Sequence, residues 1–479
     1  MRFSLRCASW GLPFLMVACA NLSPPRENAA AAAAPADVAP LQWQAPLPHN
    51  GRLEDMRQWW QQQGDPLLVA LIDGAQTVSP SVAVARSRIE QSRSALVISQ
   101  AAQAPSLDAS ASASRALNQP NIPVTTALQA GLLAAWEIDL FGANRSASAG
   151  AAERLASAQA SWHDARVSAA AETANQYFQL LACHEQLTLT RLDADSRAET
   201  VRLLGISTRA GFTASGDLAL GRAGAADAAN QAVVVGAQCD AMVKALVALT
   251  GLAEPDLRSK LAKADRKYRE FAPVFIASIP AEALDQRPDI FAASRDIAAA
   301  SHDLSSNQAQ NYPRLSLSGS IGFLSAHTGG FSTEMSTWSI GPLALSLPLF
   351  DGGRRKANTE AAKARYDEAV ALYRAKARQA VREVEQALVN LKAASDRNAN
   401  TDIAAEAWRA ALNATLARQR IGFANLIEVE EVRRQALAAD VGRLGLQRDR
   451  LLAWVAVYRA VGGGWRQTAL LANTPDKAQ

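Results

Sequence analysis

The chain repeats itself once, with a displacement of about 210 residues. Six residues in one stretch recur at a constant offset of 208, as Pro80, Ala85, Ile89, Leu96, Pro105 and Leu107 and again as Pro288, Ala293, Ile297, Leu304, Pro313 and Leu315. Further along, the pair Gly211-Phe212 recurs as Gly422-Phe423, at an offset of 211. A constant offset followed by a small drift is typical of a duplicated unit, and chance matching in an alanine-rich chain is the alternative. Each element expected in one copy is therefore expected twice.

Each copy contains a very long segment that favours helix. Residues 144–204 and 354–416 are almost free of glycine and proline and rich in Ala, Glu, Arg and Gln. About 60 residues at about 1.5 Å each give a helix of roughly 90 Å, which a compact domain cannot bury. We expect each helix to run beside an antiparallel partner, residues 215–250 and 426–460, as a coiled-coil hairpin. The two Gly-Phe pairs then lie at the hairpin tips.

Alternating stretches precede the long helices and predict strands. Apolar residues at every second position point one way, with serine, glycine or charged residues between them. The apolar sets are Leu315, Leu317, Ile321 and Phe323, then Leu343, Leu345, Leu347 and Leu349, and in the first copy Leu128, Leu132, Trp136, Ile138 and Leu140, with Gln129, Glu137 and Asp139 opposite. These runs predict hairpins at about 106–141 and 314–350. Nine to twelve residues is the length of a tilted transmembrane strand.

The first residues predict export. Residues 1–18 have a basic start, a short apolar core and a small residue before Cys19, as a cleaved signal peptide has. "LMVA" before Cys19 resembles a bacterial lipobox, in which the thiol receives lipid; a plain signal peptide with an incidental cysteine is the alternative. Residues 19–50 are Pro/Ala-rich and predict a tether. Loss of Arg2 and Arg6 reduces the net charge of +4 to about +2, without a basic cluster that would favour nucleic-acid binding.

Four strands per chain predict an oligomer. No later segment has 18 uninterrupted apolar residues, so a membrane would be crossed by strands. Four strands can neither close a barrel nor satisfy their edge hydrogen bonds in lipid. Three copies would supply twelve strands, within the range of closed outer-membrane barrels, although strand count alone does not choose three over two or four.

Five motifs carry a resemblance to a known family. They are "SIPAEALDQRPDI" (278–290), "EIDLFGANR" (137–145), "LPLFDGGRR" (347–355), "WWQQQGDPLL" (59–68) and "YRAVGGGW" (458–465). With them the chain resembles the TolC-type outer-membrane efflux lipoproteins, the outer-membrane factors of RND tripartite pumps, of the NodT-like subfamily.

The resemblance implies a mainly α fold with membrane β structure. It implies a homotrimer whose twelve-stranded outer-membrane β-barrel, four strands per chain, continues into a periplasmic coiled-coil α-barrel. Such a duct is no enzyme; it passes small molecules from an inner-membrane RND-type transporter through a periplasmic adaptor and needs no cofactor beyond the lipid on Cys19. We expect repeats at 51–270 and 271–465, and a tail at 466–479.

Two carboxylates at the second tip are candidate gate residues. Glu428 and Glu431 are three residues apart and share a helix face, and in a trimer each would form a ring that repels itself and binds cations. Family members carry aspartates at matching positions. Asp217, matched to Glu428 in the first tip, is a weaker candidate. Solvated charges on an exposed helix are the alternative.

The tips themselves are candidate adaptor contacts by the same resemblance. The set is Arg209, Gly211, Phe212, Arg420, Gly422 and Phe423. Glycine permits the tight reversal, and an exposed aromatic beside arginine suits an interface. In the alternative reading, phenylalanine only packs the hairpin end.

Cys183 and Cys239 lie equally far, 28 residues, on either side of Gly211. An antiparallel hairpin turning there brings the thiols level, and in an oxidising periplasm we expect a disulfide bond. Two unpaired small core residues are the alternative.

Other functions have less support. The five histidines are scattered, and the HExxH, P-loop and GxSxG patterns are missing, so catalysis is not expected. The duct of a type I protein-secretion system shares the fold, but the lipobox and "ALDQRPDI" favour efflux. A periplasmic coiled-coil scaffold would leave the alternating strands unexplained.

Overall fold

The computed structural model describes residue 44 and residues 59–117, 123–263 and 284–465. Cys19, the signal peptide, most of the tether and the tail therefore lie outside the described residues. The chain divides into two compact units, the first containing residues 88–158 and 292–374 and the second most of the remainder.

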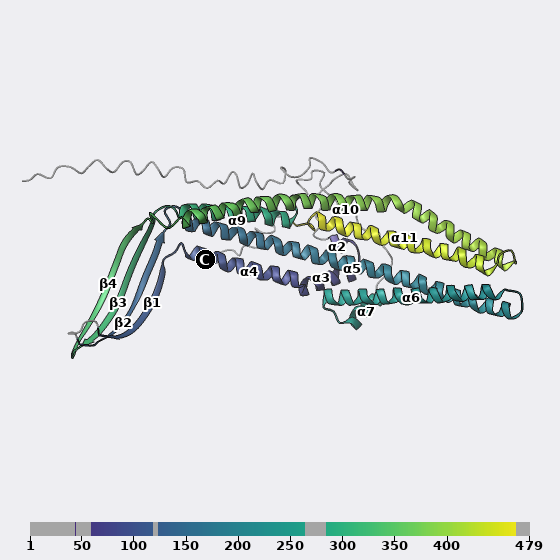
Figure 1. Cartoon of the computed structure of the whole chain (residues 1–479), viewed down its shortest axis with the longest axis horizontal. Helices are drawn as coiled ribbons and strands as arrows, with labels where there is room; N and C mark the ends of the chain where they lie inside the picture. The colour runs from purple at the N-terminus through teal and green to yellow at the C-terminus, as the bar shows by residue number, and fades with distance from the viewer. Residues whose placement is uncertain (1–43, 45–58, 118–122, 264–283, 466–479) are drawn as a thin grey trace, which may run out of the picture. The chain divides into compact units, whose positions relative to one another are not determined.

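The first unit contains a four-stranded antiparallel sheet. Its strands are β1 (Ser106–Ala116), β2 (Thr125–Ile138), β3 (Arg314–Thr328) and β4 (Phe331–Ser346), in the order β1-β2-β3-β4 (Figure 1). The central pair joins the two copies, because β2 from the first copy is in register with β3 from the second, from Thr125↔Thr328 to Ile138↔Leu315. The duplicated hairpins therefore form one continuous sheet.

The pairing register separates two chemically different faces. Leu132, Ile321 and Trp338 are aligned across β2, β3 and β4, and they share one face of the sheet. Their neighbours Leu133, Ser320 and Ser339 are aligned on the other. Because side chains alternate along a strand, the first face is apolar and the second is dominated by small hydroxyl side chains.

The last strand is shorter than the sequence predicts. β4 ends at Ser346, so Leu347 and Leu349 are outside the sheet and the predicted hairpin limit of about 350 is wrong. Pro348 has no backbone N–H to donate, which explains why pairing does not continue. A register shift between Leu317 and Gly319 lies opposite the cis bond Gly341-Pro342.

Close helix contacts complete the first unit. α5 (Ala143–Arg209) begins beside α9 (Pro288–Ala309), and Ser306 Oγ donates to Ala143 O at 2.8 Å. Gly150 permits this approach, because a Cβ there would lie 3.3 Å from Ala299 O. α4 (Pro80–Ala101) precedes β1, and α10 (Arg354–Arg420) follows β4.

The second unit contains most of two helical hairpins, α5 with α6 (Ser215–Thr250) and α10 with α11 (Leu426–Ala460); the first turns of α5 and α10 belong to the first unit. α5 and α10 each have 67 residues, five and four more at the C-terminal end than predicted. Gly205 lies inside α5 without ending it, since the surrounding turns remain hydrogen-bonded and glycine costs a helix only about 1 kcal/mol.

In the core of the second unit, short helices pack against the long ones. α2 (Trp59–Gln62), α3 (Pro66–Val78) and α7 (Glu254–Lys263) pack there with α5, α6, α10 and α11. The Trp59 and Tyr458 rings stack with centroids 5.0 Å apart. Asp65 caps α3 by accepting from two backbone N–H groups, and its second oxygen accepts from Tyr177 Oη at 2.8 Å.

Among the described helices, α6 is long and apolar enough to cross a membrane. The helices α3 and α4, which are bent relative to each other, would add a second candidate if they are counted as one span. α6 is the return helix of the first hairpin, and a packed helix can share this composition.

Candidate functional site

The two hairpin tips have the same backbone geometry. Gly211 and Gly422 have φ angles of +79° and +82°. In each tip the phenylalanine N–H bonds five residues back, Phe212 to Ser207 O at 2.9 Å and Phe423 to Arg418 O at 2.8 Å. This is a Schellman ending, which uses glycine because the left-handed conformation strains other residues.

The aromatic side chains at the tips point into solvent. Phe212 is 86% exposed and Phe423 is 74% exposed, so neither packs the hairpin end within this chain. Arg209 and Arg420 are exposed beside them. Two apolar side chains held out by a rigid turn suit a protein contact, and the packing alternative does not describe them.

A disulfide bond ties the first hairpin. Cys183 on α5 and Cys239 on α6 are bonded, with their Cα atoms 5.6 Å apart. The pairing that the equal spacing about Gly211 predicted is therefore present in the structure. Both cysteines are buried in the helical core, at 6% and 2% exposure.

A buried arginine holds the start of the second copy to its end. Arg287, from the "RPDI" motif, donates to Asp289, to Glu383 Oε2 at 2.9 Å and to Ala460 O at 2.8 Å. Burial works to lower the pKa of Arg287, but the two carboxylates outweigh it and the pKa is raised. The side chain is 8% exposed, and its charge is compensated by paired carboxylates.

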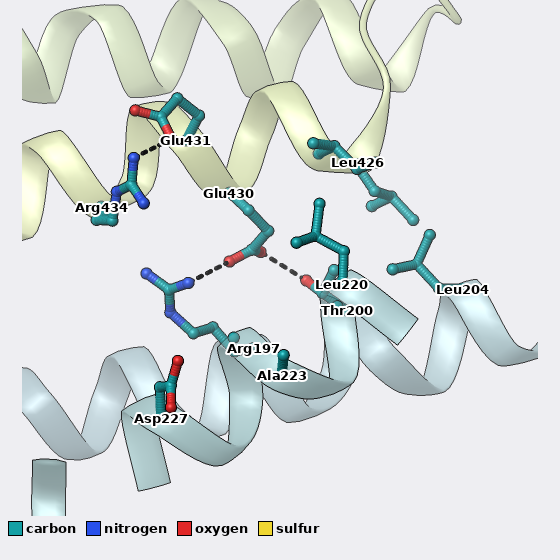
Figure 2. Close-up of a pocket in the computed structure, with 13 residues that line it drawn as sticks. Arg197, Thr200, Leu204, Leu220, Ala223, Asp227, Leu426, Glu430, Glu431 and Arg434 are labelled. Atoms are coloured by element: carbon teal, nitrogen blue, oxygen red, sulfur yellow. Dashed lines mark hydrogen bonds and ion pairs between the residues drawn. The ribbon is translucent and has the colours of Figure 1, made fainter. Parts of the chain in front are cut away.

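A cavity of about 260 Å³ lies where α11 approaches α5 and α6 near the tips. Figure 2 shows Glu430 of α11 pointing between Arg197 and Thr200 of α5. Thr200 Oγ1 donates to Glu430 Oε1 at 2.7 Å, and Arg197 Nη1 lies 3.9 Å from Oε2, an ion-pair distance too long for a hydrogen bond. Glu430 also pairs with Arg433. These contacts connect the first hairpin to the second.

Of the predicted gate carboxylates, Glu431 lines this cavity next to Glu430, whereas Glu428 and Asp217 are not among its lining residues. Glu428 accepts from Arg418 Nη1 at 2.7 Å and its backbone N–H is capped by Asn425. Glu431 pairs with Arg434, and hydrogen bonds from Arg434 and Gln435 lower its pKa. Asp217 is half-buried in the first turn of α6. Within one chain, the structure does not bring the three carboxylates together.

Sequence reasoning missed Glu430, Arg197, Thr200 and Asp193. Asp193 Oδ2 accepts from Arg197 Nε at 2.8 Å, which orients the guanidinium toward Glu430. Asp193 and Arg197 are four residues apart on α5, a spacing that predicts a helix ion pair. No spacing rule links position 197 to position 430, because the contact depends on how two hairpins pack.

Two adjacent groups in the first third of α5 have shifted pKa values. Burial, reinforced by Arg166, lowers the pKa of His163 to about 4. Burial and the charge of Asp289 raise the pKa of Asp164. Among the described residues, clusters of three or more His, Cys, Asp or Glu side chains that could hold a metal ion are absent.

The sequence pattern of the outer membrane efflux proteins matches this chain at residues 71–252 and again at 279–463. The chain belongs to that family, whose pattern matches it in these two segments. It is an outer-membrane protein and not an enzyme.

Individual relatives agree along nearly the whole chain. The pyoverdine export outer membrane protein OpmQ of Pseudomonas aeruginosa is 28% identical and covers 94% of this chain and 95% of its own. The outer membrane protein OprJ of the same species is 30% identical, with 87% and 88% covered. The crystal structure of the Campylobacter jejuni CmeC outer membrane channel superposes with a TM-score of 0.78 at 26% identity, covering 90% and 92%. Efflux and the outer membrane are therefore common to this chain's family.

Proposed function

We propose that three copies of this chain form the outer-membrane exit duct of a tripartite efflux pump. The observation that carries the proposal is the sheet, which has one apolar face, one hydroxyl-lined face and, in the described chain, edge strands β1 and β4 paired on one side only. Pairing β4 of each copy with β1 of the next closes twelve strands and leaves no edge. The apolar face then meets lipid and the hydroxyl face lines the pore.

The helical hairpins form the periplasmic part in this proposal. Phe212 and Phe423, with their neighbouring arginines, contact a periplasmic adaptor that hands over substrate from an inner-membrane RND-type transporter. The thiol of Cys19 carries lipid that anchors the chain in the outer membrane. The family's description as efflux proteins and the name of OpmQ, a pyoverdine export protein, favour small molecules over protein secretion as cargo.

The second hairpin tip carries the gate. Rings of Glu428 and Glu431, with a weaker contribution from Asp217, repel one another when three copies converge and select cations. Glu430 has a different role, since its hydrogen bond to Thr200 holds the second hairpin against the first. Opening the gate then requires this contact to loosen.

Single-channel recording of the purified trimer tests the proposal. We expect discrete cation-selective steps, and we expect Glu428→Gln with Glu431→Gln to reduce cation preference. Glu406 is an exposed carboxylate on α10, away from the tip, and Glu406→Gln is the matched control. It should leave the cation preference unchanged. A monomer in detergent, or a trimer whose selectivity is the same in all three proteins, would contradict the duct and the gate respectively.

A further inference from the structure

An exposed segment directly after the sheet has a composition unlike the rest of the unit. Residues 347–356, "LPLFDGGRRK", connect β4 to α10, and we call them the sheet-end segment. Leu349 is 90% exposed and Phe350 is 91% exposed. Arg354 and Lys356 follow within six residues, both exposed.

The corresponding segment of the first copy does not expose its phenylalanine in this way. Phe141 in "LFG" corresponds to Phe350 at an offset of 209. Phe141 stacks on Tyr312 with ring centroids 4.9 Å apart and is half-buried. Phe350 occupies the same place in the repeat, yet nearly all of its surface is open to solvent. The turn itself therefore does not require an exposed ring.

The charge of the sheet-end segment is positive. Its one carboxylate, Asp351, accepts from Arg355 Nε at 2.9 Å, and Arg355 also donates to Pro348 O. Arg354 and Lys356 form no ion pair with the part of the chain that the structure describes. Two free cations thus lie beside two exposed apolar side chains, on one short stretch.

The position of the segment identifies the surface it meets. All four connections between strands and helices leave the same end of the sheet, where Ser346 is opposite Arg314 and Ile138 is opposite Leu315. Leu343 and Leu345 bring the apolar face of β4 to that end. If the sheet spans the outer membrane as proposed above, this end lies at the periplasmic lipid headgroups. Apolar side chains that enter the acyl region beside cations that contact phosphate are typical of an interfacial anchor.

We propose that the sheet-end segment binds anionic phospholipid of the periplasmic leaflet. Leu349 and Phe350 insert between acyl chains, and Arg354 and Lys356 bind the headgroup phosphates. The inference rests on the proposed membrane position of the sheet, and it adds a lipid-specific contact to the generally apolar surface that any spanning sheet has.

A lipid titration tests the proposal. Detergent-solubilised full-length protein is titrated with fluorescent phosphatidylglycerol, and with phosphatidylcholine as the zwitterionic reference. Each basic residue near an anionic surface changes affinity about fivefold, so Arg354→Gln/Lys356→Gln should weaken phosphatidylglycerol binding about 30-fold. Phosphatidylcholine binding should weaken much less, because its choline cation compensates the charge of its phosphate. Phe350→Ser should weaken both lipids.

The chain offers a matched control in Arg374 and Lys376. This pair has the same spacing, is exposed on the same helix and lies about 30 Å further along it. Arg374→Gln/Lys376→Gln should bind phosphatidylglycerol as the unmodified protein does. Equal loss in both pairs, or no loss in either, would overturn the proposal.

Two further measurements separate the remaining outcomes. If Phe350→Ser breaks the trimer in lipid-free detergent, Phe350 packs on a neighbouring copy and the lipid contact is wrong. Conductance of Arg354→Gln/Lys356→Gln separates this inference from the duct, since normal conductance with unchanged lipid affinity refutes the lipid contact alone. A protein that conducts in none of its forms refutes the duct itself.

Discussion

The two helical hairpins match in helix length and tip geometry, but different bonds join their helices. Both outgoing helices have 67 residues, and both tips end in the same glycine turn. The first hairpin is joined covalently by Cys183 and Cys239. The second has Ala394 and Arg450 at the corresponding positions, and its helices are connected near the tip by the ion pairs Arg409–Asp440 and Arg418–Glu428.

The two hairpins therefore have the same outgoing-helix length and the same tip turn, but different interactions join their helices. Exposed ion pairs contribute about 0–1 kcal/mol each and exchange readily with water, whereas a disulfide bond does not open without a reductant. The first hairpin therefore suits a fixed support, and the second suits a moving part.

Removing the disulfide bond should have the largest effect. Cys183→Ser/Cys239→Ser releases a loop with a sequence separation of 56, which corresponds to about 4 kcal/mol in the chain-entropy account. Hydrogen exchange should become faster in α5 and α6 and stay unchanged at the α10–α11 tip. The double variant should also lose any response to dithiothreitol. Equal acceleration in both hairpins would show that they do not differ in the way described.

Cutting the contact between the hairpins should have the next largest effect. Glu430→Gln weakens a charge-assisted hydrogen bond at a site with 17% side-chain exposure, and we expect a loss of about 2 kcal/mol. Glu428→Gln, at 39% exposure, should cost less than about 1 kcal/mol. The two midpoints of thermal unfolding, measured at one scan rate, give the comparison. Similar shifts would remove the special role of Glu430.

Acid should destabilise the first copy through His163. The pKa of His163 is lowered to about 4, mainly by burial, while the unfolded chain keeps the ordinary value. Between about pH 6.5 and 4 the unfolded state takes up a proton that the folded state refuses, so stability falls across this window and levels off below it. The corresponding position in the second copy is Arg374, which is exposed. Unfolding midpoints against pH should be flatter for His163→Gln; an identical slope would exclude His163 as the cause.

Alanine substitutions of two helix glycines should have the smallest effects on stability. Gly442 in α11 has open space around an added Cβ, so Gly442→Ala should stabilise by up to about 1 kcal/mol through helix propensity. At Gly221 in α6 the Cβ would lie 2.7 Å from Leu204 Cδ1. Gly221→Ala should therefore gain less, because Leu204 must move. Equal gains in thermal midpoint for the two variants would mean that α5 and α6 do not pack closely at Gly221.

Much of the fold could be predicted because the long helices and the alternating strands follow from local sequence patterns. Helices 215–250 and 426–460 follow from composition and the glycine tips, and strand alternation follows from one apolar face. The end of β4 could not be placed, because "LPL" continues the alternation although Pro348 cannot pair. The adjacency of β2 and β3 joins segments about 200 residues apart, and neither strand carries a signal for its neighbour.

Less of the candidate site than of the fold could be predicted from the sequence. Counting from Gly211 located the disulfide bond because both cysteines belong to one hairpin. Glu428 and Glu431 were chosen for their helix face, but Glu430 makes the contact with the other hairpin, since the packing angle of two hairpins decides which side of α11 faces inward. The roles of Glu428, Glu431 and Asp217 stay predictions.

The contact between Arg287 and Ala460 bears on how such a chain could arise. The hydrogen bond, of 2.8 Å, holds the N-terminal end of α9 beside the C-terminal end of α11. Gly462 allows this closeness, because a Cβ there would be 2.2 Å from Gln286 O. A unit with adjacent ends can be doubled within one gene by adding a short connector, without rethreading the chain. If three copies form the proposed ring, an ancestral half-length polypeptide would build that ring from twice as many subunits.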